Sequence, residues 1–401
     1  QLPGVSGTLT GARVSSLVID KDVDDDASNG YQSAVVQGGI AYDSIYLDGS
    51  ATPIASVSAL GDPGFKRFCS ANLVEAGSLA GGRGFADRIY LVGEEEFSGA
   101  GGSFFALDVN SRAIHEVVGF GKGTWESATI IDTGNPDTVA VLLFDDAKAP
   151  LYMWVGNKSK DPSAGFLERN GLAAGQGSLY TFVTNALGEN GVSPGADSSD
   201  LLAFTQLNGL NQAIAGRWVD LASLNPGYAA LGAPDLRNLA VSAGALQLSR
   251  IEDGEVNPLN QRQAVFVTTG TRDFANGDLY GNVLTLDFSA AFTAAGLLSG
   301  SGSSVLKVVY DADLLADPTT GIRNPDNLTI SADGFVYLQE DRANGGNWES
   351  SGIIDVSAIY GALPGSFFLA NVQAHSLSGG SIGGSGYLGE GGQINLIQQI
   401  F

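Results

Sequence analysis

The sequence contains a single cysteine and only two histidines among its 401 residues. One cysteine excludes an internal disulfide bond, so Cys69 cannot provide the crosslink that stabilises many exported domains. His115 and His375 offer little material for a Ser-His-Asp hydrolase or a histidine-rich zinc site. No stretch reaches the roughly 18 apolar residues that a membrane-spanning helix needs, so we expect no membrane span.

Basic residues are also scarce, because 20 Lys and Arg face 43 Asp and Glu and the net charge is −23. Such an acidic chain repels nucleic acid and anionic membranes, and it favours solubility or the binding of divalent cations. The phosphate-cradling motif GxxxxGK[ST] is absent. We therefore expect no nucleic-acid partner, and we expect divalent cations as ligands.

Glycine is abundant, with 56 residues against 13 prolines, and 44% of the chain is hydrophobic. This composition indicates a folded protein that is rich in turns. Short β-branched and aromatic runs bounded by Gly, Asp, Asn and Ser recur along the whole chain, whereas helical patterns occur only near Ala291 and Asp313. The sequence predicts an all-β protein that forms one domain over residues 1–401.

Several expected strands run directly into carboxylates, as in "GEEE" before Phe97, "LFDD" before Ala147 and "YLQED" before Arg342. Radially arranged sheets bring one end of each inner strand toward a shared axis, where these carboxylates could meet. Clustered carboxylates repel one another, so they need cations, shared protons or wide separation, and cations are the simplest solution. Oxygen ligands suit Ca²⁺, and carboxylates together with one thiolate suit iron. The alternative is that each acidic pair caps an exposed turn and that Cys69 is a small buried apolar residue.

An ordered series of segments resembles the PhoX-type alkaline phosphatases from about Ala12 to the C-terminus. These segments are FKRFCSANLVE, DRIYLVGEEE, GTWESA, LFDD, PLYMWVGNKS, SRIEDGEVNP, NPDNLTISADGFVYLQED, ESSGIIDVSAIYG, FFLANVQAH and LGEGGQINLI. The resemblance implies one β-propeller of about six blades, with a first blade that is incomplete at the N-terminus. It also implies a secreted, periplasmic or cell-surface bacterial protein that hydrolyses phosphate monoesters with iron and calcium at the propeller axis.

The resemblance also assigns roles to individual residues. It implies the metal ligands Cys69, Glu94, Glu95, Glu126, Glu252, Asp326, Glu340 and Glu390. Arg250, in "SRIEDG", would hold the substrate phosphate, although Ile251 stands where the family usually has proline. Family members carry a further N-terminal part with a His-Glu element, and nothing equivalent precedes Ala12 in this sequence.

Two other functions are open at this stage. The first is a catalytically inactive, calcium-stabilised surface or structural propeller that self-associates or mediates adhesion. The second is another propeller hydrolase, such as a lactonase or a calcium-dependent phytase. Iron absorption and phosphomonoesterase turnover that depends on Cys69 would distinguish the phosphatase from both.

Overall fold

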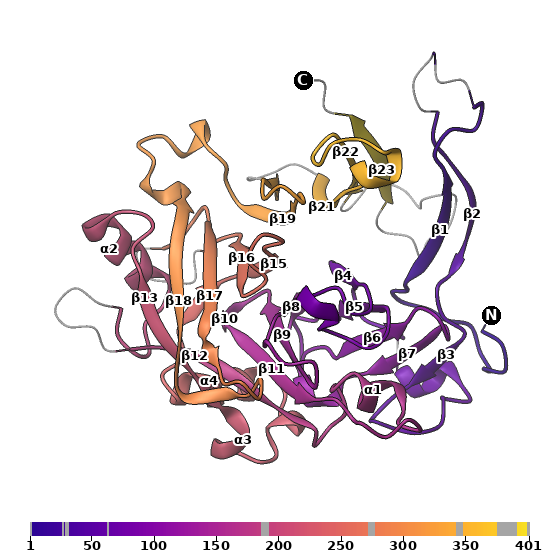
Figure 1. Cartoon of the computed structure of the whole chain (residues 1–401), viewed down its shortest axis with the longest axis horizontal. Coiled ribbons are helices and arrows are strands. Elements are labelled where there is room, and N and C mark those ends of the chain that lie inside the picture. The colour runs from indigo at the N-terminus through magenta and orange to yellow at the C-terminus, as the bar shows by residue number, and fades with distance from the viewer. Residues whose placement is uncertain are drawn as a thin grey trace.

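The structure is a computed structural model that describes residues 2–25, 28, 32–61, 64–185, 192–271, 277–341, 348–374 and 391–398. Within these residues the chain is mostly β-structure with few helices (Figure 1). The all-β class expected from the sequence is confirmed in this form. No helix in the described part of the chain has both the length and the apolar character needed to cross a membrane.

The largest sheet has nine antiparallel strands in the order β15-β16-β17-β18-β13-β12-β11-β9-β8. Its strands are β8 (Trp125–Ile131), β9 (Thr138–Asp145), β11 (Tyr152–Asn157), β12 (Gly177–Thr184), β13 (Ile214–Asp220), β15 (Ile251–Val256), β16 (Gln263–Thr268), β17 (Asn282–Phe292) and β18 (Leu298–Asp311). The two end strands, β15 and β8, lie in contact. The sheet therefore nearly closes on itself like a barrel.

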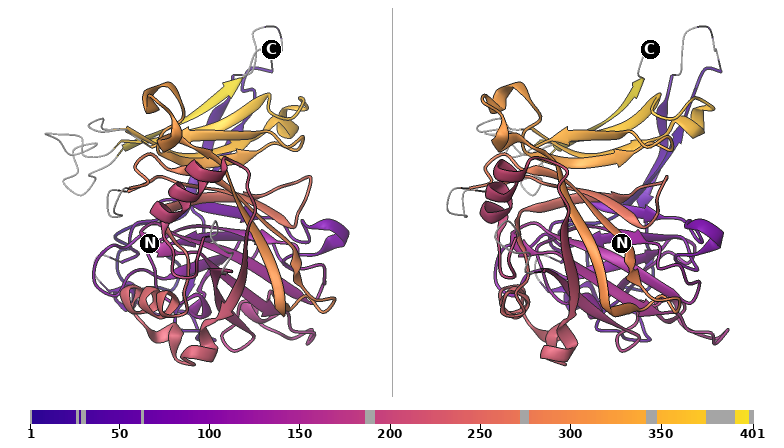
Figure 2. Two further views of the ribbon diagram at one scale, coloured as in Figure 1. Left: turned by 90° about the vertical axis from the view of Figure 1, so that its left-hand side faces the viewer. Right: turned by 60° about the vertical axis from the view of Figure 1, so that its left-hand side comes forward.

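A second sheet has five strands in the order β3-β7-β6-β5-β4, and smaller sheets complete the fold. The five strands are β3 (Ser44–Tyr46), β4 (Ala71–Val74), β5 (Ile89–Gly93), β6 (Phe104–Asp108) and β7 (Ala113–Glu116). The smaller sheets pair β1 (Ser15–Asp20) with β2 (Ala34–Ile40), β10 (Lys148–Pro150) with β14 (Gln247–Ser249), and β19 (Pro325–Ile330) with β20 (Val336–Glu340). The last sheet joins β21 (Trp348–Asp355), β22 (Phe367–Ala374) and β23 (Gly391–Gln398). Figure 2 shows β21–β23 as a layer over one end of the larger sheets, with the β1–β2 hairpin reaching up beside it.

The helices lie in connections between strands. They are α1 (Phe166–Arg169), α2 (Ser198–Asn208), α3 (Leu221–Leu224) and α4 (Ala233–Ser242). Asp197 caps α2 through the backbone N–H groups of Ser199 and Asp200, as expected for a short acidic side chain at a helix start. The prediction of a helix near Ala291 is wrong, because this residue lies in β17, a strand that pairs with β18. Pairing with a neighbouring strand overrides the helix propensity of alanine.

A buried aromatic cluster joins the five-stranded and nine-stranded sheets. Trp125 makes edge contacts with Phe104 and Tyr152, and Trp154 packs against Phe120. Every residue of β8 and β9 is buried. Strands that are covered on both faces hold their ends rigidly, so the side chains at these ends are well positioned for a site.

Candidate functional site

Acidic side chains from separate strands meet where these strands begin or end. Glu126 is the second residue of β8 and Glu252 is the second residue of β15, whereas Asp146 directly follows β9. Trp125 at the start of β8 pairs with Asp145 at the end of β9, so both strand ends lie at the same edge. The antiparallel register therefore brings side chains that are distant in sequence into one place.

Two overlapping groups of side chains have the composition of metal sites. The first group contains Cys69, Glu95 and Glu126, and the second contains Glu126, Asp146 and Glu252. Within each group, the potential ligand atoms all lie within 4.8 Å of one another. Glu126 belongs to both groups, so its carboxylate could bridge two neighbouring cations.

Burial and mutual repulsion make this cluster unfavourable without a cation. Burial, followed by repulsion from Glu95 and Glu252, raises the pKa of Glu126 well above its ordinary value. Burial and repulsion from Asp146 raise the pKa of Glu95 to about 7. The Oε2 atom of Glu126 is buried and accepts no hydrogen bond from any described residue. A buried oxygen without a donor, among other carboxylates and one thiolate, fits a metal ligand.

Asp326, the second residue of β19, lies near the same cluster. Its carboxylate contributes to the raised pKa values of Glu126 and Glu252, after burial and nearer charges. The strand pairing is irregular around Glu126, Glu252 and Asp326. The register shifts between Trp125 and Ala128 in β8, between Ile251 and Gly254 in β15, and between Pro325 and Leu328 in β19. Such irregularities redirect side chains at strand ends, and here each one contains an acidic residue of the cluster.

Two arginines contact the cluster from the side of the solvent. Arg250 donates from Nε to Oδ1 of Asp146 at 2.8 Å, and its Nη2 lies 3.0 Å from Oε1 of Glu252. Arg67 donates to both carboxylate oxygens of Glu95. Paired guanidinium groups of this kind partly compensate buried carboxylates.

Comparison with known proteins identifies the family of this chain. The family model described as "Alkaline phosphatase PhoX" matches residues 106–361, which is more than half of the chain. The chain belongs to the PhoX alkaline phosphatase family. A solved structure titled "Pseudomonas fluorescens PhoX in complex with vanadate, a transition state analogue" is similar in fold, with a TM-score of 0.57 and 15% sequence identity. The match covers 92% of this chain and 77% of that chain. A comparison with curated protein sequences finds none that matches.

Most of the ligands implied by the PhoX resemblance lie together in the structure. Cys69, Glu95, Glu126 and Glu252 belong to the two metal-type groups, and Asp326 lies beside them. Arg250, the expected phosphate-binding residue, contacts the second group. The sequence alone could not show that these residues share one site.

Three other expected ligands have different surroundings or lie outside the described residues. Glu94 accepts hydrogen bonds from the backbone N–H groups of Lys66 at 2.7 Å and Ser103 at 2.9 Å. Glu340 is exposed, and its Oε1 accepts a hydrogen bond from the backbone N–H of Arg323 at 2.6 Å. Glu390 lies outside the described residues. The described groups of metal-type ligands therefore include neither Glu94 nor Glu340.

Sequence reasoning missed Asp146 as a member of the site. The motif "LFDD" did mark both Asp145 and Asp146 as acidic strand ends, but it could not separate their roles. Asp145 is buried and bonds to Arg237, with Nε at 2.8 Å from Oδ2, and it accepts the backbone N–H of Thr124. Successive residues at a strand end point to opposite sides, so Asp146 faces the cluster and Asp145 does not.

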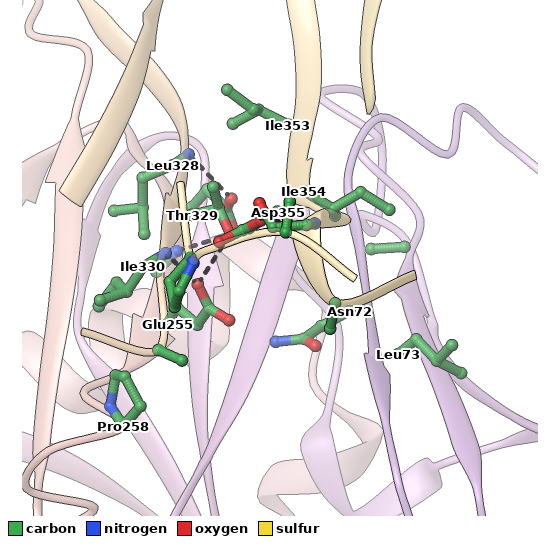
Figure 3. A pocket seen from close by; sticks show the side chains of 18 residues that line it. Asn72, Leu73, Glu255, Pro258, Leu328, Thr329, Ile330, Ile353, Ile354 and Asp355 are labelled. Atoms are coloured by element: carbon green, nitrogen blue, oxygen red, sulfur yellow. Dashed lines mark hydrogen bonds between the residues drawn. The ribbon is translucent and has the colours of Figure 1, made fainter. Parts of the chain in front are cut away.

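Two cavities adjoin this region. One, of about 480 Å³, is lined by Cys69, Ser70, Asp253 and Asn371 among other residues, so it reaches the first metal-type group. The other, of about 500 Å³, is lined by Asp253, Glu255 and Asp355 (Figure 3). Desolvation by burial raises the pKa of Asp253 to about 6 and that of Glu255 to about 7. The second cavity is acidic but is not lined by any residue of the two metal-type groups.

Proposed function

We propose that this protein is a metal-dependent phosphomonoester hydrolase. The PhoX family membership supports this function. The observation that carries it is that Glu126 belongs to two sets of ligands and that its Oε2 atom accepts no hydrogen bond from the described residues. Glu126 would help to hold a cation in each group, and two such cations would supply the charge that stabilises the attacking and the leaving oxygen in phosphoryl transfer.

Iron and calcium are the cations that we propose for these positions. The group of Cys69, Glu95 and Glu126 includes the thiolate, which favours iron, whereas Glu126, Asp146 and Glu252 offer oxygen only, which suits calcium. Asp326 would complete the oxygen ligands. When bound, these cations supply the positive charge that phosphate oxygens need and activate a water molecule for attack.

The residues of the chain itself have distinct tasks in this proposal. Arg250 binds an oxygen of the phosphate through its forked guanidinium and fixes the orientation of the ester. Thr269 donates to Oε1 of Glu252 and holds this carboxylate in place. The rigid ends of β8 and β15 keep Glu126 and Glu252 at a fixed separation. The cavity beside Cys69 gives the substrate access.

The remaining expectations about architecture and location form part of the same proposal. We propose one domain built as a β-propeller of about six blades, in which β8, β15 and β19 are inner strands that start at the axis. Their acidic second residues support this arrangement. We also propose that the protein is secreted, periplasmic or bound at the cell surface, as the resemblance to the family implies.

Elemental analysis of the purified protein, combined with turnover of p-nitrophenyl phosphate, tests this function. We expect iron and calcium in the wild type, and loss of both iron and turnover in Cys69→Ala. Calcium without iron or turnover would instead favour the inactive structural propeller. Hydrolysis of sugar lactones without phosphatase activity would favour a lactonase.

A further inference from the structure

The two arginines at the cluster have the same spacing in the sequence to a candidate ligand and make similar ion pairs. Arg67 lies two residues before Cys69, and Arg250 lies two residues before Glu252. Each arginine pairs with a carboxylate of the same group, which is Glu95 for Arg67 and Asp146 for Arg250. The site thus consists of two similar halves that share Glu126. The family resemblance assigns a role only to Arg250.

Contacts within the two halves are also alike. Arg67 donates from Nε to Oε2 of Glu95 at 2.5 Å and approaches Sγ of Cys69 with Nη2 at 4.0 Å. Arg250 donates from Nε to Asp146 and also contacts Glu252. Each guanidinium therefore bridges one carboxylate and a second ligand of its own group.

The arginines lie at the boundary between this cluster and the solvent. The side chain of Arg67 is 39% exposed and that of Arg250 is 33% exposed, whereas those of Glu95 and Asp146 are 0% and 1% exposed. The two guanidinium groups are therefore accessible to a phosphate group in solvent, whereas the carboxylates that they pair with are not. Their position favours contact with the substrate and not only a structural ion pair.

We propose that Arg67 is a second phosphate-binding residue and that it pairs with Glu95 as an internal counter-ion until cations bind. This inference rests on the proposed function and names a further specificity residue of the same site. A bound cation draws charge from Glu95, which weakens its ion pair with the guanidinium. The guanidinium of Arg67 then lacks a full counter-charge, and a phosphate dianion provides that negative charge.

Calorimetry with inorganic phosphate tests the inference, on protein that retains its metals and on the same protein after EDTA treatment. We expect phosphate to bind only to the metal-containing wild type. Arg67→Gln should keep its metals, as measured by elemental analysis, and should bind phosphate about tenfold more weakly, because a charge-assisted fork is lost. Its KM for p-nitrophenyl phosphate should rise more than its kcat falls.

Two further variants control this experiment. Arg83 forms a similar two-point ion pair with Asp132, away from the cluster, so Arg83→Gln should bind phosphate like the wild type. Arg67→Lys retains the charge beside Glu95, so it should keep the metals even if Arg67→Gln loses them. A lysine has no planar fork, so phosphate binding by Arg67→Lys should still be weaker than in the wild type.

The outcomes separate this inference from the function on which it rests. If metal-containing Arg67→Gln and Arg67→Lys bind phosphate as tightly as the wild type, the inference is wrong, and wild-type turnover still supports the phosphatase. If phosphate binding requires Arg67 but no phosphomonoester is hydrolysed, the inference holds and the proposed function fails. Phosphate binding that persists unchanged after EDTA treatment would overturn the counter-ion role of Arg67.

Discussion

Glu126 and Glu252 place carboxylate oxygens within 4.8 Å of each other although they come from β8 and β15, the two end strands of the nine-stranded sheet. The near-closure of this sheet is therefore what creates the site. Both residues are at most 2% exposed, so water contributes little to screening their charges. The protein has to neutralise this pair with protons, arginines or cations.

Replacement of Glu126 by glutamine should stabilise the metal-free protein and weaken metal binding. Burial raises the pKa of Glu126, so the metal-free native state loses stability as the pH rises through that raised value, and the amide removes this loss. In EDTA at pH 8 we expect Glu126→Gln to unfold at a higher temperature than the wild type. Its free energy of unfolding should be larger by about 1–3 kcal/mol. Calorimetric melting with and without EDTA checks this.

The metal-containing protein should show the opposite effect of Glu126→Gln. Because Glu126 belongs to both groups, its replacement should reduce the metal content and the melting temperature in the absence of EDTA. An equal metal content in the variant and the wild type would argue against the shared ligand. Glu168→Gln, at an exposed turn that closes on Gly165, is a suitable control for an ordinary change of charge.

The neighbours Glu94 and Glu95 should respond differently to the same substitution. Glu95→Gln loses a ligand and the ion pair with Arg67, so we expect it to lose metal. Glu94→Gln should retain metal but lose about 1–2 kcal/mol of stability, because its amide group can accept only one of the two backbone hydrogen bonds. Elemental analysis and thermal melting distinguish the two. If Glu94→Gln lost metal and Glu95→Gln kept it, Glu94 and not Glu95 would be the metal ligand.

The sequence predicted the chemical character of this site better than its exact membership. The resemblance to the PhoX family placed Glu126, Glu252 and Asp326 in one site, and in the structure these three carboxylates lie close enough to affect one another's charge. The choice between adjacent carboxylates could not be predicted. It depends on which way each strand end turns, as for Asp145 and Asp146, and local irregularities of register change that direction.

Long-range pairing set the limits of prediction for the fold as well. Short β-branched and aromatic runs predicted β-structure along the chain, but the near-closure of the large sheet depends on contact between β8 and β15, which lie far apart in sequence. Local signals were insufficient for the helices, because α2 was not predicted although Asp197 caps its start. They failed at Ala291, where a helix-favouring segment is held in β17 by its partner strand.

A buried carboxylate outside the cluster should govern part of the pH dependence. Burial raises the pKa of Asp278 from 3.8 to about 7, even though Ser249 and the backbone N–H of Gly281 donate to it. Since the folded pKa is the higher one, its contribution to stability is complete below about pH 4 and is lost as the pH rises through 7. Between pH 4 and pH 8 the stability of Asp278→Asn relative to the wild type should therefore rise by about 4 kcal/mol.

Urea unfolding at pH 4, 6 and 8 in the presence of EDTA measures this effect. Asp313→Asn is a matched control nearby, because this carboxylate is only about half-buried and accepts two backbone hydrogen bonds, from Leu279 and Tyr280. Its replacement should give no comparable gain at pH 8. A stability difference between Asp278→Asn and the wild type that stays the same from pH 4 to pH 8 would show that the pKa of Asp278 is not raised in the native protein.

A close contact between two chain segments should make Gly102 sensitive to any side chain. A Cβ atom at Gly102 would collide with the backbone oxygen and the Cβ of Glu94, directly beside the ligand candidate Glu95. We expect Gly102→Ala to lose about 1–3 kcal/mol of stability, because the segments must separate, and to bind metal more weakly since Glu95 moves with Glu94. At Gly39 a Cβ would meet no atom within 4 Å, so Gly39→Ala should leave both melting temperature and metal content unchanged. If Gly102→Ala destabilised the protein but kept its full metal content, the position of Glu95 would be independent of this contact.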